Sequence, residues 1–170
     1  MQITIPDSSL VILCGPAACG KSTFARHNFR RTQIVSSDTC RALLCDSAAA
    51  QWCSGYAFEL FHYIINRRMH LGRLTVADST ALSRSARSQL RKLAKMYNHP
   101  VILVAFDVSK ESCIRHDQAR RRRVGIEIIS QQFEKMAEAL AAIPREEYDQ
   151  VHILKEADVT TARVRMIKSQ

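Results

Sequence analysis

The sequence feature that most constrains the fold is the run Gly-Pro-Ala-Ala-Cys-Gly-Lys-Ser at positions 15–22, directly after the apolar run 10–14. The spacing G-x-x-x-x-G-K-S is typical of a loop that joins a buried strand to a helix and cradles phosphate groups with its backbone N–H groups. In such a loop Lys21 reaches the β- and γ-phosphates of a nucleoside triphosphate, and the Ser22 hydroxyl is a ligand of Mg²⁺. The pattern therefore predicts binding of ATP or another NTP with Mg²⁺. The predicted nucleotide-binding residues are Gly15, Ala17, Ala18, Cys19, Gly20, Lys21, Ser22 and Thr23.

Short apolar runs alternate with segments of helical periodicity along the chain. The apolar side chains Phe58, Phe61, Ile65 and Met69 recur at helical steps, and two further helices are expected from 83 and from 109, each opened by a serine cap. Strands separated by helices predict an α/β fold of the P-loop kinase type, with a parallel sheet flanked by helices on both faces and ligands at the carboxyl ends of the strands. The expected strands are 10–14, 33–35, 74–77, 101–106 and 151–154.

Composition favours one compact domain over residues 1–170. The chain is 46% hydrophobic, contains no Gly/Pro/Ser-rich linker, and has no run of the roughly 18 apolar residues that a membrane span needs. The first residues also lack the features of a secretory signal, so a cytoplasmic protein without membrane contact is expected. Because the C-terminal segment up to Gln170 is interpreted as helical, the chain is also expected to be a module of a longer polypeptide.

Charge and cysteine content narrow the class of partner and the redox state. The formal net charge is +9, which favours an anionic partner, with a solvated basic surface as the alternative. The six cysteines form no C-x-x-C pair, so neither a zinc site nor a disulfide framework is expected, and the cysteines are predicted to be reduced packing residues. Cys19, beside Lys21 in the anion-binding loop, is the one candidate for a reactive thiol.

The second predicted strand ends in Ser36-Ser37-Asp38, and Arg41 follows on what should be the first turn of a helix. Residues three apart share one helical face, so Asp38 and Arg41 should lie together across from the phosphate loop. There a carboxylate accepts the proton of an attacking hydroxyl, and an arginine binds a phosphate of the molecule that carries this hydroxyl. The structural alternative is a helix cap at Asp38 and an intrahelical ion pair with Arg41.

The third predicted strand ends at Asp78, which fits an aspartate that supports the water shell of the metal. Serine follows it where an ATPase motor would normally have a base to activate water, so transfer to a bound acceptor is favoured over hydrolysis. A GTPase is disfavoured because no N-K-x-D segment is present. Asp107 ends the fourth strand and is a weaker candidate, for which strand-end capping is the simpler role.

Arginines concentrate in the segment 115–126, between two predicted helices after the fourth strand. P-loop kinases carry a mobile lid at this place, and a guanidinium delivered to a transferring phosphoryl group stabilises its charge. We therefore predict that residues 115–126 form an arginine-rich lid, the "lid segment" below. The alternative is a solvated basic helix end.

Three motifs together resemble a known family. They are G-x-x-x-x-G-K-S-T-F-A at 15–25, S-S-D-x-C-R at 36–41 and H-Y-I-I-N-R-R-M-H-L-G-R-L-T-V at 62–76, followed by the lid arginines. Over nearly the whole chain the sequence is similar to the N-terminal kinase domain of bacterial polynucleotide kinase-phosphatase, an RNA end-healing enzyme. The resemblance implies transfer of the γ-phosphate of an NTP to a 5′-hydroxyl end of RNA or DNA. It also implies phosphatase and adenylyltransferase domains in the same polypeptide and a methyltransferase partner.

The resemblance assigns a role to each matching residue. Asp38 would be the general base, Arg41 would contact the phosphate next to the terminal nucleotide, and Gln51 would lie in the segment that handles the nucleoside. Arg123 would clamp the NTP with help from Arg120, and Asp78 would belong to the outer shell of the metal at Ser22.

The sequence departs from this family at two places. The family usually has an arginine and an asparagine early in the lid, where this chain has His116-Asp117 preceded by Arg115. Either Arg115 or the run Arg121-Arg122-Arg123 would then take over that role. Ala81 stands where an asparagine is usual.

Two other functions stay open at the level of sequence. A small-molecule P-loop kinase would share the loop, the base and the lid but would need a closed acceptor pocket with dedicated side chains. A non-catalytic, NTP-gated RNA-binding module would bind RNA without turnover, and the position of Asp38 argues against it.

Overall fold

The computed structural model describes residues 1–169, and its centre is a five-stranded parallel sheet in the order β3-β4-β2-β5-β6. Each expected strand is present, with ends that differ by at most one residue from the predicted ones. The α/β class with a parallel sheet is therefore confirmed. The strands are β2 (Leu10–Cys14), β3 (Ile34–Ser36), β4 (Thr75–Asp78), β5 (Val101–Asp107) and β6 (Gln150–Lys155).

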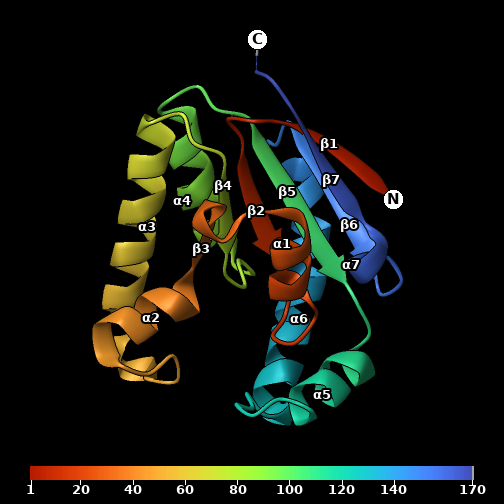
Figure 1. The fold of residues 1–170 in the computed structure, drawn as a ribbon. Coiled ribbons are helices and arrows are strands. Elements are labelled where there is room, and N and C mark those ends of the chain that lie inside the picture. Colours follow the sequence, from red (N-terminus) through yellow and green to blue (C-terminus); the bar gives the residue numbers. More distant parts are fainter. Residues whose placement is uncertain (170) are drawn as a thin grey trace.

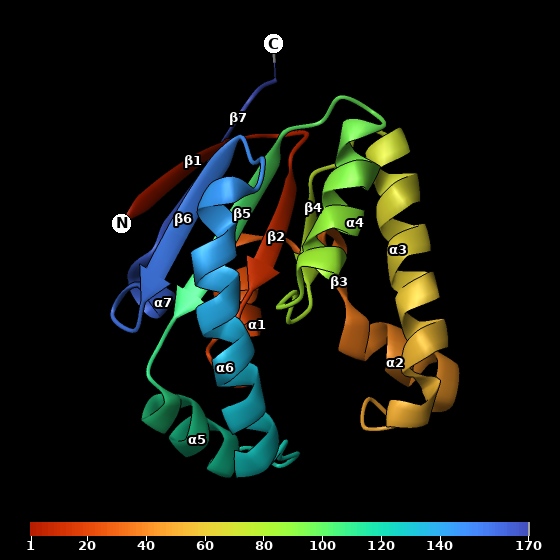
Figure 2. The same ribbon diagram turned by 180° about the vertical axis from the view of Figure 1, so that it is seen from behind.

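Helices cover both faces of this sheet. The helices α3 (Ser54–His70), α4 (Arg84–Lys95) and α6 (Ile126–Ala142) lie over one face (Figure 2), and α1 (Lys21–Asn28) lies over the other (Figure 1). Two further helices, α2 (Ser37–Cys45) and α5 (Lys110–Gln118), lie beyond the carboxyl ends of the strands. No helix in residues 1–169 combines the length and the apolar character needed to cross a membrane.

The helical stripes expected from the sequence form the core. Phe61, Ile65 and Met69 of α3 are fully buried and pack with Leu10 and Ile12 of β2 on the face that α3, α4 and α6 cover. The predicted caps are also present, since the Ser83 and Ser109 side chains accept hydrogen bonds from backbone N–H groups three residues further on.

The two ends of the chain form a second sheet that the sequence interpretation missed. β1 (Gln2–Pro6) pairs in parallel with β7 (Arg163–Ile167), which follows the four-residue helix α7 (Asp158–Thr161). The expectation of a helical C-terminal segment is therefore wrong. The alternation in β1, where Ile3 and Ile5 are buried and Gln2 and Thr4 are exposed, is the period-two pattern of a strand with one covered face.

One expectation about cysteine was also wrong. Cys45 and Cys53 form a disulfide, although Cys14, Cys19, Cys40 and Cys113 are free and buried as predicted. The chain turns back after α2, so that these two Cα atoms lie 6.8 Å apart despite a separation of eight residues. This turn depends on the tertiary structure, and the spacing of the cysteines in the sequence does not predict it.

The loop between β2 and α1 needs both of its glycines. Gly20 has φ +100°, and a Cβ built on it would lie 2.4 Å from Cγ1 of Val159. A Cβ on Gly15 would lie 2.8 Å from Sγ of Cys19 and 3.0 Å from Cβ of Phe106. Ala18 also has a positive φ of 62°, so the loop curls tightly.

A buried ion pair supports the segment that follows β4. The Arg87 and Glu146 side chains are each 1% exposed and are joined by hydrogen bonds of 2.6 and 3.0 Å. Arg87 also donates to the carbonyl groups of Ala81 and Leu82, and the Tyr148 hydroxyl donates to Glu146. Burial favours the neutral form of Glu146, but the hydrogen bonds from Arg87 and Tyr148 outweigh it and lower the pKa of this carboxyl.

Removal of Arg87 should destabilise the fold strongly. Arg87→Met leaves the Glu146 carboxylate buried without its partner, which typically costs about 3–5 kcal/mol of the free energy of unfolding. Urea denaturation measures this loss. The double variant Arg87→Met/Glu146→Leu should lose less free energy of unfolding than the single variant, because no buried charge remains unpaired.

The exposed pair Lys95–Glu147 is the matched control, and Glu147→Gln should leave the denaturation midpoint essentially unchanged. Equal losses at both pairs would contradict a supporting role for Arg87.

A side chain at position 20 should disturb the loop. Gly20→Ala places a Cβ against Val159 in a strained backbone conformation, which costs about 1–3 kcal/mol. Gly55→Ala is the control, since a Cβ at position 55 would have no neighbour within 4 Å and alanine is favoured over glycine in a helix by about 0.5–1 kcal/mol. Thermal or urea unfolding of both variants should therefore give shifts of opposite sign. A Gly20→Ala protein as stable as the original would mean that Val159 and the loop relax without cost.

Candidate active site

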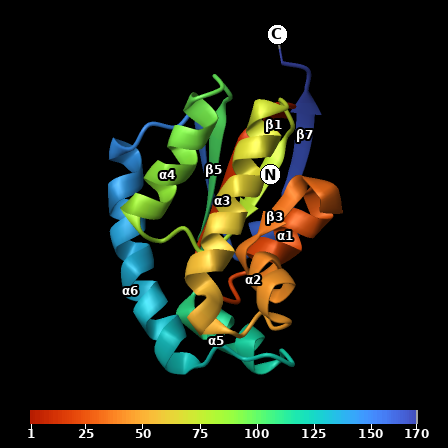
Figure 3. The same cartoon turned by 90° about the vertical axis from the view of Figure 1, so that its left-hand side faces the viewer.

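A cleft of about 760 Å³ opens at the carboxyl ends of the strands, where α2, α3, α6 and the lid segment surround the loop 15–20. Figure 1 shows α2 and α5 on either side of this edge, and Figure 3 shows the same edge from the side of α3. It is called the main cleft below. Its lining residues are Ala17, Ala18, Gly20, Lys21, Ser22, Arg26, Ser36, Ser37, Asp38, Arg41, Gln51, Ser54, Phe58, Asp78, Ser79, Thr80, Arg120, Arg122, Val124, Ile128 and Gln132.

The phosphate loop is held from several directions. The Gly15 N–H donates to the Thr80 carbonyl over 3.0 Å, and the Ala17 N–H donates to Oε1 of Gln132 over 2.6 Å. The Lys21 ammonium folds back on the loop and donates to the carbonyl groups of Gly15 and Pro16 at 2.8 and 2.5 Å. The Lys21 ammonium therefore lies within the loop. The protons that it donates to these carbonyl groups could be donated to phosphate oxygens instead.

Ser22 and Asp78 meet at the start of α1. The Ser22 hydroxyl donates to Oδ2 of Asp78 over 2.8 Å, and Asp78 is the last residue of β4, as the sequence predicted. Burial raises the pKa of the Asp78 carboxyl above its usual value, although Lys21 and the Ser22 hydrogen bond oppose this shift. A hydroxyl and a carboxylate are oxygen ligands of the kind that Mg²⁺ selects, so this pair fits a magnesium ion bound next to phosphates.

Asp38 and Arg41 lie together on α2, as the sequence predicted. The helix is capped by Ser36, so Asp38 is not its cap, and Oδ1 of Asp38 accepts a hydrogen bond from Arg41 over 2.6 Å. The Asp38 side chain is 58% exposed to the cleft, whereas Arg41 is only 7% exposed. Oδ2 of Asp38 lies 3.2 Å from a guanidinium nitrogen of Arg122 in the lid segment. The carboxylate is therefore held by two arginines while remaining accessible.

The segment between α2 and α3 forms one wall of the main cleft. Arg41 donates a second hydrogen bond to the carbonyl of Ala48 over 2.9 Å, and the Cys45–Cys53 disulfide closes the same segment. Gln51 lies between these two attachments and lines the cleft. The segment that the resemblance assigns to nucleoside handling is thus tied to the arginine beside Asp38.

Residues 119–125 of the lid segment form an irregular loop between α5 and α6, and Asp117 tethers this loop. Its carboxylate is buried and accepts hydrogen bonds from the N–H groups of Val124 and Gly125 at 2.9 to 3.1 Å, which closes the loop over the arginines. Arg120 and Arg122 line the main cleft. Arg123 is exposed and is not among the lining residues, so its predicted contact with the nucleotide needs a movement of the lid.

The early part of the lid segment differs from what the family resemblance suggested. Arg115 hydrogen-bonds to Ser112 and pairs with Glu156, and it does not line the main cleft. His116 instead contacts the phosphate loop, with Nδ1 3.2 Å from the carbonyl oxygen of Ala18. Arg115 is therefore not positioned as a substitute for the missing arginine, and the later arginines are closer to the site.

Some of the residues predicted to belong to the site do not line the main cleft. Gly15, Cys19 and Thr23 are not among its lining residues, and the Cys19 side chain is buried beneath the loop. Asp107, the weaker candidate, pairs with Lys155 at the end of β6.

Sequence reasoning also missed lining residues that come from distant parts of the chain. Gln132 supports the loop from α6, and no local motif marks it. Arg26 follows the phosphate loop by one helical turn and could have been found from that spacing. The further lining residues that were not predicted are Ser36, Ser37, Ser54, Phe58, Ser79, Thr80, Val124 and Ile128.

Solved structures with the same fold include a chain of an RNA repair complex and a sugar-acid kinase. A chain of the Pnkp1/Rnl/Hen1 RNA repair complex matches with a TM-score of 0.69 and 18% identity, over 85% of this chain and 48% of that one. A gluconokinase from Sinorhizobium meliloti matches with a TM-score of 0.57 and 14% identity, over 92% and 90% of the two chains. The protein thus spans about half the length of the RNA repair chain.

A third solved structure is the PezAT chromosomal toxin-antitoxin system of Streptococcus pneumoniae, with a TM-score of 0.63, 13% identity, and coverage of 92% of this chain and 70% of that one. No curated protein sequence matches this chain. At these identities the structural matches establish the fold. This fold is that of the P-loop kinases, which bind a nucleoside triphosphate at the loop between β2 and α1.

A family model described as an AAA domain matches residues 10–143, which extend from β2 to the end of α6. The match includes the phosphate loop, Asp38, Asp78 and the whole lid segment. The chain therefore belongs to this AAA-domain family of P-loop proteins.

Proposed function

We propose that the protein is a polynucleotide 5′-hydroxyl kinase that transfers the γ-phosphate of ATP or another NTP to the 5′-hydroxyl end of RNA or DNA. The observation that carries the proposal is the position of Asp38, an accessible carboxylate in the same cleft as the phosphate loop. A group at this place can accept the proton of a hydroxyl that attacks the γ-phosphorus.

The charge of the main cleft suits an acceptor that is itself a polyanion. Its lining contains two carboxylates, Asp38 and Asp78, against five cationic side chains. An excess of cationic over acidic side chains in a cleft is typical of sites that bind a phosphate backbone. The whole chain also carries a net charge of +9. The five cations are Lys21, Arg26, Arg41, Arg120 and Arg122.

The proposed reaction is an in-line displacement. The 5′-hydroxyl oxygen forms a bond to the γ-phosphorus, its proton passes to the Asp38 carboxylate, and the bond to the bridging oxygen breaks to release the nucleoside diphosphate. Arg41 orients Asp38 through their hydrogen bond and contacts the phosphate next to the terminal nucleotide. Lys21 exchanges its contacts with loop carbonyls for the β- and γ-phosphates.

The remaining residues neutralise charge as the transfer proceeds. Ser22 would hold Mg²⁺, with Asp78 in its outer shell, and the ion would supply charge neutralisation between the β- and γ-phosphates. Arg120 and Arg122 already lie at the cleft, and Arg123 would join them when the lid closes on the nucleotide. Gln51 would border the terminal nucleotide.

The wider setting is also part of the proposal. One of the structural neighbours is a chain of an RNA repair complex, and this protein spans about half of that chain. We therefore propose a role in RNA repair, with phosphatase and adenylyltransferase activities on further domains and a methyltransferase as partner.

A kinase for a small metabolite is the second candidate, because a gluconokinase has the same fold and a similar length. It would use the same loop, base and lid.

Transfer from γ-labelled ATP to different acceptors tests the proposed function. A 5′-hydroxyl oligonucleotide should be labelled, whereas free nucleosides and sugars should not, because they lack the phosphates that the cleft cations would bind. Asp38→Asn should lower kcat by about 10²- to 10⁴-fold, the usual worth of a general base, and leave ATP affinity within a few fold. Asp107→Asn is the control, since Asp107 pairs with Lys155 outside the cleft. Labelling of a sugar in preference to the oligonucleotide would contradict the proposal.

The lid arginines should differ in their contribution. Arg122 contacts Asp38 and lines the cleft, so Arg122→Ala should lower kcat/KM by about 10³-fold, the lower end of the range for arginines at a transferring phosphoryl group. Arg121→Ala should have little effect, because Arg121 is exposed and does not line the cleft. Arg123→Ala tests whether Arg123 reaches the NTP when the lid closes. If Arg123 clamps the NTP, this variant should lose as much kcat/KM as Arg122→Ala. Full activity of Arg122→Ala would remove Arg122 from the mechanism.

A further inference from the structure

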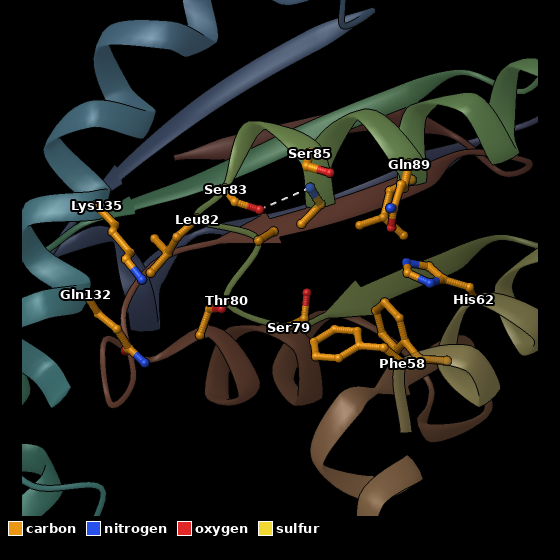
Figure 4. A pocket seen from close by; sticks show the side chains of 14 residues that line it. Phe58, His62, Ser79, Thr80, Leu82, Ser83, Ser85, Gln89, Gln132 and Lys135 are labelled. Carbon is orange, nitrogen blue, oxygen red and sulfur yellow. Dashed lines mark hydrogen bonds between the residues drawn. The ribbon is translucent and has the colours of Figure 1, made fainter. Parts of the chain in front are cut away.

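A second pocket of about 420 Å³ adjoins the main cleft and is called the side pocket here. Figure 4 shows Phe58 and His62 of α3 on one side, Ser85 and Gln89 of α4 on the other, and Gln132 and Lys135 of α6 at one end. The segment 79–82 after β4 forms its floor. Its volume lies within the range of about 300–1,000 Å³ that is usual for small-molecule sites.

The side pocket and the main cleft adjoin each other. Four residues line both of them: Phe58, Ser79, Thr80 and Gln132. Two of these four are bound to the phosphate loop itself, since the Thr80 carbonyl accepts from Gly15 and the Gln132 side chain accepts from Ala17. A molecule in the side pocket can therefore present one end to the phosphates through the shared boundary.

The lining of the side pocket is aromatic at one end and carries neutral polar groups around it. Phe58 packs edge-on against Phe61, with ring centroids 5.8 Å apart. The ring centroids of His62 and Phe58 lie 6.1 Å apart. Burial lowers the pKa of His62, so its imidazole is neutral at physiological pH and offers one donor and one acceptor. Gln89 faces His62 from α4 with an amide that also donates and accepts (Figure 4).

Among the described residues that line the side pocket there is no carboxylate, and Lys135 is the one permanently charged side chain. A cationic ligand is therefore disfavoured. Flat aromatic rings beside groups that both donate and accept are the elements by which proteins bind an unstacked nucleobase. The hydroxyl groups of Ser79 and Thr80, at the boundary with the main cleft, suit the sugar that joins the base to its 5′-hydroxyl.

We propose that the side pocket binds the terminal nucleoside of the acceptor strand, with its base between Phe58, His62 and Gln89 and its 5′-hydroxyl directed past Ser79 and Thr80 toward the phosphate loop. This inference rests on the proposed function and specifies the acceptor subsite of the same reaction. His62 and Gln89 are binding residues in it, because they contact the base and not the reacting atoms.

The test uses the base itself as one arm of a double-mutant cycle. A 5′-hydroxyl oligonucleotide and the same oligonucleotide with an abasic terminal residue are compared as acceptors for wild type, His62→Leu and Gln89→Leu. Wild type should use the base-bearing acceptor about tenfold more efficiently in kcat/KM, in keeping with the usual worth of base stacking. Each variant should lower kcat/KM for the base-bearing acceptor about three- to tenfold, as expected for a lost hydrogen bond, and leave the abasic acceptor unchanged.

Two controls separate binding from folding. Gln131→Leu makes the same chemical change on an exposed residue of α6 that lines neither pocket, and it should behave as wild type. The KM for ATP should stay within twofold in all variants, because the donor site lies on the phosphate loop.

Several outcomes would overturn the inference. If wild type phosphorylates base-bearing and abasic ends equally well, the side pocket does not hold the base, although the proposed function stands. Equal losses for both acceptors in His62→Leu and Gln89→Leu would mean that these residues act only through the fold. If no 5′-hydroxyl end is phosphorylated but a small anionic acceptor is, and Lys135→Met suppresses that reaction, both the proposed function and the nucleoside assignment are wrong.

Discussion

The alignment of three parallel strands at one residue, Asp78, determines the rest of the site. In the sheet register, Asp78 of β4 lies opposite Leu13 of β2 on one side and Ser36 of β3 on the other. The phosphate loop therefore begins two residues past this row, and α2, which carries Asp38, begins one residue past it. Because the strands are parallel, β2, β3 and β4 all end at the same edge of the sheet. The phosphate loop, the Asp78 carboxylate and the proposed base Asp38 therefore meet at this edge, although no local sequence signal links them.

The segment after β4 carries much of the remaining organisation. It separates the main cleft from the side pocket, and its backbone is held on both sides. Arg87, fixed by its buried pair with Glu146, donates to the carbonyl groups of Ala81 and Leu82, while the Thr80 carbonyl accepts from Gly15 in the phosphate loop. Ala81 adopts φ 46°, a left-handed conformation that asparagine tolerates better than alanine, so this network maintains a backbone that alanine alone would disfavour. A buried charge pair that lines neither pocket thus holds the segment along which an acceptor would lie.

The sequence predicted the main sheet, the helices on both faces and the positions of Lys21, Ser22, Asp38, Arg41 and Asp78 at one edge. These predictions succeeded because each depends on short spacings: a loop motif between a strand and a helix, polar residues at strand ends, and two side chains one helical turn apart. The predictions that failed concern pairings between distant segments. β1 and β7 combine the two ends of the chain, and the Cys45–Cys53 disulfide depends on how the chain turns after α2. Within the arginine run, spacing could not tell which side chains face the cleft, because residues 119–125 form an irregular loop closed by Asp117 and not a helix.

By itself, the sequence determined that a phosphate loop lies between a buried strand and a helix, and that an acidic residue and an arginine follow the next strand. Those features follow from covalent order, since glycines, apolar runs and helical periods act over a few residues. Only the tertiary structure decided that Gln132 supports the loop from 115 residues away, that Arg122 rather than Arg123 contacts Asp38, and that α3, α4 and α6 enclose a side pocket. The physical reason is that pockets and cross-chain hydrogen bonds form where helices pack, and packing depends on the shapes of all the contacting side chains together and not on any one segment.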